Sequence, residues 1–127
     1  MKLFISCMFF FILSINCIYP ESLEDYISIA EEYHDRGDFE RAIVYLERSI
    51  EIDPENARLY YLIGYIYYQL DDSNNAIRYL SQAIERNSTY AQAYAVIGII
   101  YFNQENYIMA FDNFLQASNY DRENDEY

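Results

Sequence analysis

Residues 57–90 read ARLYYLIGYIYYQLDDSNNAIRYLSQAIERNSTY, and the same pattern occurs 34 residues earlier and 34 residues later. Shifting the chain by this distance aligns residues 23–56, 57–90 and 91–124 without an insertion. The aligned positions include Tyr26, Tyr60 and Tyr94; Ala30, Gly64 and Gly98; Tyr33, Tyr67 and Tyr101; Ala42, Ala76 and Ala110; and Leu46, Leu80 and Phe114. A repeat of this length indicates one supersecondary unit stacked three times, because a single unit cannot bury its apolar face alone.

Each unit contains two apolar segments that have the spacing of helices. Ile43, Leu46 and Ile50 recur at intervals of three and four residues, which is typical of one face of an amphipathic helix. Polar breaks that should end helices fall at 36–38, 71–74 and 103–106. The sequence therefore predicts an all-α fold with six helices near 22–35, 39–51, 55–70, 73–86, 90–103 and 107–119.

Small residues mark the places where paired helices should approach closely. Ala30, Gly64 and Gly98 occupy one such position, and the three aligned alanines that follow them are expected to supply the facing contact. With the flanking aromatic residues and the closing Pro54, this pattern resembles the tetratricopeptide repeat family over about four fifths of the chain. Tyr stands where that family usually has Trp. The resemblance implies three antiparallel helix pairs stacked in a short right-handed superhelix, an α-solenoid.

The resemblance also implies that the first helix of each pair lines a concave groove that binds peptides. The groove residues that it implies are Tyr61, Tyr65, Tyr68 and Gln69 from the second unit, Ala95, Ile99, Phe102 and Asn103 from the third, and Ile27, Glu31, His34 and Asp35 from the first. Clamps for peptide carboxylates in this family need Lys, Arg and Asn on these helices, and the sequence lacks that basic cluster. The tyrosines at the aligned repeat positions, in contrast, are expected in the core.

The charge of the chain limits its partners. Lys+Arg number 8 and Asp+Glu 21, a net charge of −13, so nucleic acid is excluded because phosphate neutralisation needs a basic face. The charge is concentrated in residues 21–56 and 91–127, and residues 57–90 are neutral. A basic or apolar extended segment would complement this distribution. The alternative is that the acidic surface only keeps the protein soluble.

The first residues have the composition of an export signal. Lys2 precedes an apolar run over 3–15, and no acid occurs before Glu21. Residues 13–17, LSINC, resemble a bacterial lipoprotein cleavage box, although Ser14 and Asn16 depart from its usual residues. This resemblance implies a signal over 1–16, possible lipidation of Cys17, a tether over 17–22 and a periplasmic or cell-envelope location. An ordinary signal peptide and an uncleaved anchor are the alternatives.

The sequence contains no recognisable catalytic, metal or cofactor motif. His34 is the only histidine, both cysteines precede the repeats, and none of the three glycines forms a phosphate loop. We therefore expect no enzyme activity, no metal and no cofactor, and predict a scaffold that binds a protein segment in the groove. The repeats are followed by residues 125–127, which the sequence predicts to be an acidic tail.

Two other functions are compatible with the sequence. The chain stops at Tyr127 without an extra polar helix, so the last predicted helix should leave an apolar patch through which a homo-oligomer could assemble. The residues expected in that patch are Ile108, Met109, Phe111, Phe114 and Leu115. The other alternative is a small-ligand-binding accessory protein of a transporter.

Overall fold

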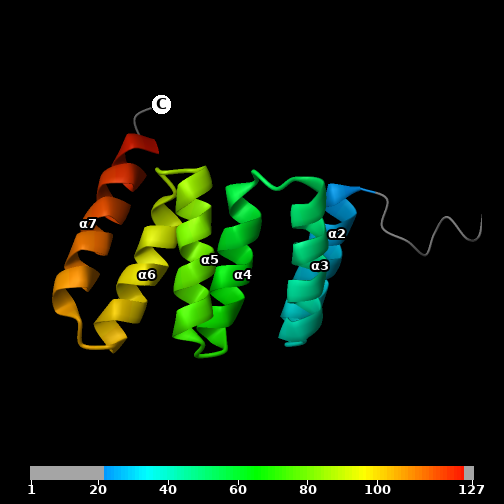
Figure 1. The fold of residues 1–127 in the computed structure, drawn as a ribbon, viewed down its shortest axis with the longest axis horizontal. Coiled ribbons are helices and arrows are strands. Elements are labelled where there is room, and N and C mark those ends of the chain that lie inside the picture. The colour runs from blue at the N-terminus through cyan, green and yellow to red at the C-terminus, as the bar shows by residue number, and fades with distance from the viewer. Residues whose placement is uncertain (1–21, 125–127) are drawn as a thin grey trace, which may run out of the picture.

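The computed structural model describes residues 22–124, which form six helices and, over that range, no strand (Figure 1). The helices are α2 Leu23–Asp35, α3 Phe39–Ile52, α4 Ala57–Gln69, α5 Ser73–Arg86, α6 Ala91–Asn103 and α7 Tyr107–Asn124. The predicted all-α fold is confirmed. The predicted signal, Cys17, most of the tether and the acidic tail lie outside the described residues. No helix of the described part is long and apolar enough to cross a membrane.

Two predicted helix boundaries differ from the structure by more than one residue, one of them by two residues and the other by five. The start of the third predicted helix, at 55, lies in a turn, because the Asn56 N–H donates to the Asp53 carbonyl before α4 begins at Ala57. The last helix continues to Asn124 instead of ending at 119. Its final residues are polar but include no Gly or Pro that would stop a helix.

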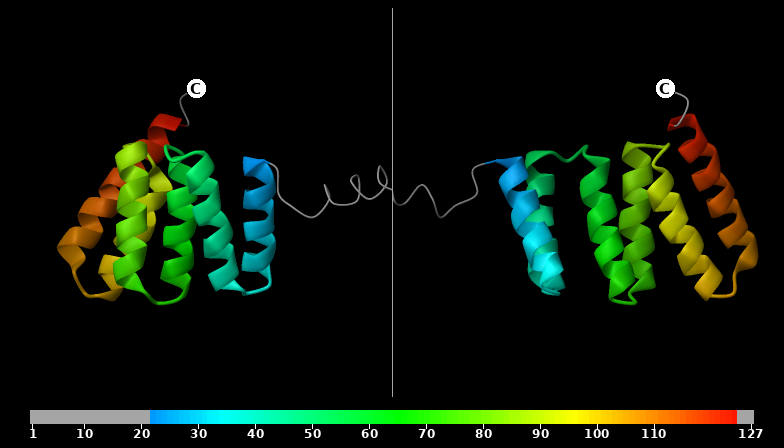
Figure 2. Two further views of the ribbon diagram at one scale, coloured as in Figure 1. Left: turned by 45° about the vertical axis from the view of Figure 1, so that its right-hand side comes forward. Right: turned by 180° about the vertical axis from the view of Figure 1, so that it is seen from behind.

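The helices form three antiparallel pairs, α2 with α3, α4 with α5 and α6 with α7, arranged in a row (Figure 1). Figure 2 shows α2 and α7 at opposite ends of this row. Within the pairs, the glycines permit close approach. A Cβ on Gly64 would lie 2.8 Å from Leu80 Cγ, and one on Gly98 would lie 2.7 Å from Phe114 Cε1. The nearest facing atoms thus belong to these bulky residues rather than to the aligned alanines.

The turn within each pair repeats with the same spacing as the helices. Gly37, Asp71 and Glu105 all have positive φ, between 59° and 76°. Each donates its N–H to the carbonyl three residues before it, at 2.8–3.1 Å. Only the first of the three is a glycine, so the two acidic residues carry a backbone conformation that costs an L-residue roughly 1–2 kcal/mol.

The core consists of two apolar clusters, one centred on the first and second pairs and one on the second and third. Among the six tyrosines expected in the core, Tyr60 is buried (6% exposed) and the other five are half-buried. The Tyr60 hydroxyl donates a hydrogen bond to the Pro54 carbonyl at 2.9 Å, and Arg86 Nε donates to the same oxygen at 2.7 Å. The Arg86 guanidinium also lies 3.7 Å from the centre of the Tyr60 ring. These contacts join the α3–α4 loop to α5.

Candidate functional site

A row of tyrosine rings lies along α4. Tyr61, Tyr65 and Tyr68 are spaced by four and three residues, which places them on one face of the helix. The ring centres of Tyr61 and Tyr65 are 6.1 Å apart, and those of Tyr65 and Tyr68 are 6.0 Å apart. Tyr90, at the start of α6, lies 5.2 Å from Tyr61 and completes what we call the tyrosine row. Because each ring contacts the next, the row is ordered before any ligand binds.

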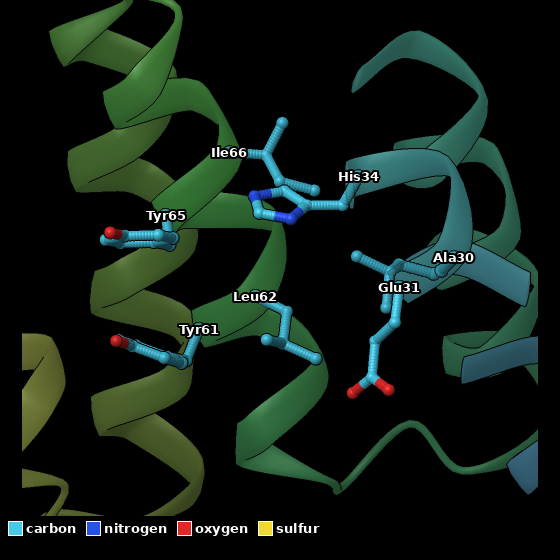
Figure 3. A pocket seen from close by; sticks show the side chains of 8 residues that line it. Ala30, Glu31, His34, Tyr61, Leu62, Tyr65 and Ile66 are labelled. Carbon is cyan, nitrogen blue, oxygen red and sulfur yellow. The ribbon is translucent and has the colours of Figure 1, made fainter. Parts of the chain in front are cut away.

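A cavity of about 360 Å³ lies beside the row, between α2 and α4. Its lining consists of Ala30, Glu31, His34, Leu46, Tyr61, Leu62, Tyr65 and Ile66. Figure 3 shows Leu62 and Ile66 pointing toward α2, whereas the rings of Tyr61 and Tyr65 extend side by side in the opposite direction. The side chains of α4 thus form an apolar wall on one side and an aromatic platform on the other. This volume is at the small end of the range for ligand pockets.

Two polar contacts span α2 and α4 near the cavity. Arg58 pairs with Glu31 Oε1 at 3.1 Å, and the Nε2 of His34 donates to Gln69 Oε1 at 2.7 Å. Both side chains of the ion pair are more than half exposed, so it contributes about 0–1 kcal/mol. A ligand can therefore displace this pair at little cost. In the described residues, no group of His, Cys, Asp and Glu is placed to hold a metal ion.

Two phenol groups of the row, those of Tyr61 and Tyr90, have a pKa above its usual value. Burial raises the pKa of Tyr61 above its usual value, and the neighbouring Tyr90 and Tyr65 raise it further. Burial also raises the pKa of Tyr90, while the positive charge of Arg58 opposes that shift. The hydroxyls of Tyr61 and Tyr90 are therefore protonated at physiological pH and can donate hydrogen bonds to a bound segment.

The residues expected in the groove are placed in different surroundings. Tyr61 and Tyr65 line the cavity, Tyr68 belongs to the row, and Gln69 is exposed at the His34 contact. In the third unit, Ile99, Phe102 and Asn103 are exposed, and Ala95 lines a separate depression of about 370 Å³ between α6 and α7. None of the four third-unit residues lines the α2–α4 cavity.

Four cavity residues were not among those expected in the groove. One of them, Ala30, was expected at a close helix contact. Leu46, Leu62 and Ile66 are aliphatic residues at helical spacing, which is typical of ordinary core positions. No feature of the sequence distinguishes them from residues such as Ile63, which is fully buried. The cavity depends on how far apart α2 and α4 lie, which the sequence pattern does not specify.

Comparison with known proteins agrees with this architecture. A family model described as TPR repeat matches residues 30–71, and one described as tetratricopeptide repeat matches residues 57–90 and 91–124. The chain belongs to the tetratricopeptide repeat family. This family is generally a non-catalytic fold for protein interaction. No curated protein matches the chain.

Several solved tetratricopeptide repeat structures have the same fold. MamA is 24% identical with a TM-score of 0.77 over 84% of this chain, which spans 62% of the MamA chain. The TPR2B domain of yeast Sti1, in a complex with pHsp70, is 24% identical with a TM-score of 0.74, covering 80% of this chain and 81% of that one. The second TPR of Spaghetti (RPAP3), bound to the HSP90 peptide SRMEEVD, is 23% identical with a TM-score of 0.70. The match covers 76% of this chain and 90% of the RPAP3 chain. At these identities the likeness shows the fold alone.

Proposed function

We propose that this protein is a non-catalytic interaction module that binds an extended segment of a partner protein across the tyrosine row. A bulky apolar side chain of that segment enters the cavity between α2 and α4. The observation that carries this proposal is the juxtaposition of a stacked aromatic platform and an apolar cavity on one helix. Tyrosine provides large contact area and a hydrogen-bonding tip at a small entropic cost, which suits peptide recognition.

The charges near the cavity favour a basic segment over an acidic one. On α2, Glu31, Glu32 and Asp35 are exposed acids. The first helices of the three pairs, α2, α4 and α6, contain a single arginine or lysine, Arg58, and it already pairs with Glu31. The HSP90 peptide in the RPAP3 structure, SRMEEVD, is acidic, whereas α2, α4 and α6 of this chain offer an acidic segment only Arg58. We therefore expect an apolar residue flanked by Arg or Lys in the bound segment.

We also propose that the protein is exported and anchored to a bacterial membrane through a lipid on Cys17. The support is the Lys2 and apolar-run pattern, together with the cleavage-box resemblance over residues 13–17. Intact-mass spectrometry of protein purified from membranes tests this. The expected mass is that of residues 17–127 plus acyl chains, and Cys17→Ser should release the protein from the membrane. A mature protein without lipid would contradict the anchor.

The binding proposal is tested on a peptide array. The probes are short peptides with a central Leu or Phe flanked by Arg, and matched peptides with Glu in place of Arg. The full chain in mild detergent should bind the first set, and Tyr65→Ala with Tyr68→Ala should weaken binding at least about 10-fold. Tyr33→Ala with Tyr45→Ala is the matched control, because this pair also stacks, at 5.5 Å, but does not line the cavity. Equal losses in both double variants, or preference for the Glu set, would contradict the proposal.

A further inference from the structure

Helix α7 carries a broad apolar face at one end of the helix row. We call the exposed side chains of Tyr107, Ile108, Phe111, Phe114 and Leu115, which share one side of the helix, the α7 face. Ile108 is 77% exposed and Phe111 66%. From Tyr107 to Gln116 the only charged residue is Asp112. Figure 2 shows α7 at the end of the row opposite α2. The cavity is lined by residues of α2, α3 and α4 and by none of α7. A face of this kind on a monomer usually marks an interaction site.

Stacking of a further repeat would not bury the whole α7 face. Phe111 aligns with Ile77 and Ile43, which are half-buried because the next pair packs near them. Ile108, however, aligns with Asn74 and Glu40, which stay exposed although the next pair is present.

The same comparison applies to Leu115, one turn after Phe111 on α7. Leu115 aligns with Ser81, which is half-buried, and with Glu47, which is exposed. The third unit thus has aliphatic side chains at two positions where the earlier units have polar ones. In the first unit both aligned residues, Glu40 and Glu47, stay exposed although the next pair is present, so a further repeat stacked in the same way would leave part of the α7 face uncovered.

The outer surface of α2 does not fit the α7 face. Leu59, Leu62 and Ile66 of α4 align with Asp25, Ser28 and Glu32 of α2. Placing α2 of a second copy on α7 would therefore bring two acids toward an apolar surface, at a large desolvation cost. This desolvation cost disfavours head-to-tail stacking of copies into a filament.

We propose that two copies of this protein form a symmetric dimer in which their α7 faces pack against each other. The five side chains at their observed exposures present roughly 600 Å² per copy, about three quarters of the ~800 Å² that each partner contributes to a standard interface. In an antiparallel arrangement centred near Phe111, Ile108 of one copy lies opposite Leu115 of the other. Such an isologous contact satisfies both faces at once and leaves the two cavities at the outer ends.

Sedimentation of the purified full chain in density-matched detergent tests the dimer. We expect a mass of two chains at micromolar concentration. Ile108→Glu with Leu115→Glu should raise the dimer dissociation constant at least about 100-fold without unfolding, because the first unit has Glu at both aligned positions. Ile52→Glu with Leu70→Glu is the control, since these side chains are 52% and 48% exposed, at the end of α3 and at the C-cap of α4, and their substitution should leave the dimer intact.

Photo-crosslinking distinguishes a second copy from another protein. Benzoylphenylalanine in place of Phe111, in cells that express the full chain, should give an adduct with the mass of two chains. Loss of that adduct in the Ile108→Glu, Leu115→Glu background supports the assigned face. Adducts with a different protein alone, or a chain that sediments as a monomer at 100 µM, would overturn the proposal. Equal weakening by the control double variant would overturn the assignment to α7.

Discussion

Replacing Gly64 with alanine tests how closely α4 and α5 pack. The added Cβ would lie 2.8 Å from Leu80 Cγ and 3.0 Å from the Leu80 backbone nitrogen. The backbone atom cannot move without shifting α5, and overpacking of this kind typically costs 1–3 kcal/mol. Alanine in a helix regains about 1 kcal/mol relative to glycine. We therefore expect Gly64→Ala to lower the free energy of unfolding by about 0–2 kcal/mol.

Gly98→Ala is the matched comparison in the next pair. The three atoms nearest to its Cβ would be ring atoms of Phe114, at 2.7–3.2 Å, and that side chain is partly exposed and can turn away. The gain in helix propensity then offsets most of the clash, so the net change should lie within about 1 kcal/mol of zero. Urea unfolding followed by circular dichroism measures both variants. A Gly64→Ala variant more stable than the parent, or a larger loss for Gly98→Ala, would refute the packing argument.

Three further changes have defined outcomes. Glu105→Gly should raise the free energy of unfolding by about 0.5–1 kcal/mol, measured by urea unfolding, because glycine adopts the positive φ of that turn without strain. Arg86→Ala should lower the thermal midpoint, with a loss of about 1–2 kcal/mol, because it removes the cation over the Tyr60 ring and a charge-assisted hydrogen bond; an unchanged midpoint would contradict this. Hydrogen bonds from Asn75 lower the pKa of Asp72 in the folded protein. The stability that this carboxylate contributes is present above about pH 4 and should be lost as the pH falls through the pKa of the folded state. Acid titration of the unfolding free energy should show a flatter decrease in Asp72→Ala than in the parent.

The fold could be predicted from the sequence because the same residue pattern occurs three times at a spacing of 34 residues. The same small, aromatic and aliphatic positions recur with constant spacing, so each unit supports the assignment of the others. Helix ends were predicted less well where local signals were misleading. Pro54 is typical of a helix start, yet it lies in a turn that Asp53 and Asn56 close by a hydrogen bond.

The candidate site could be predicted only in part. The spacing of Tyr61, Tyr65 and Tyr68 places them on one face, and the structure shows their rings in contact. The position of the cavity could not be predicted, because it depends on the separation of the first and second units rather than on a motif. The apolar walls of the cavity, Leu62 and Ile66, have the same pattern as core residues.

Methyl NMR of the full chain in detergent, titrated with the best Arg-flanked peptide from the array, tests the central claim most directly. Ile66 lies in the cavity wall, and Ile108 lies on α7 at the far end of the row. If the peptide binds as proposed, the Ile66 methyl signals shift with saturation while the Ile108 signals stay in place. Saturable shifts at Ile108 with none at Ile66 would contradict binding at the tyrosine row and its cavity.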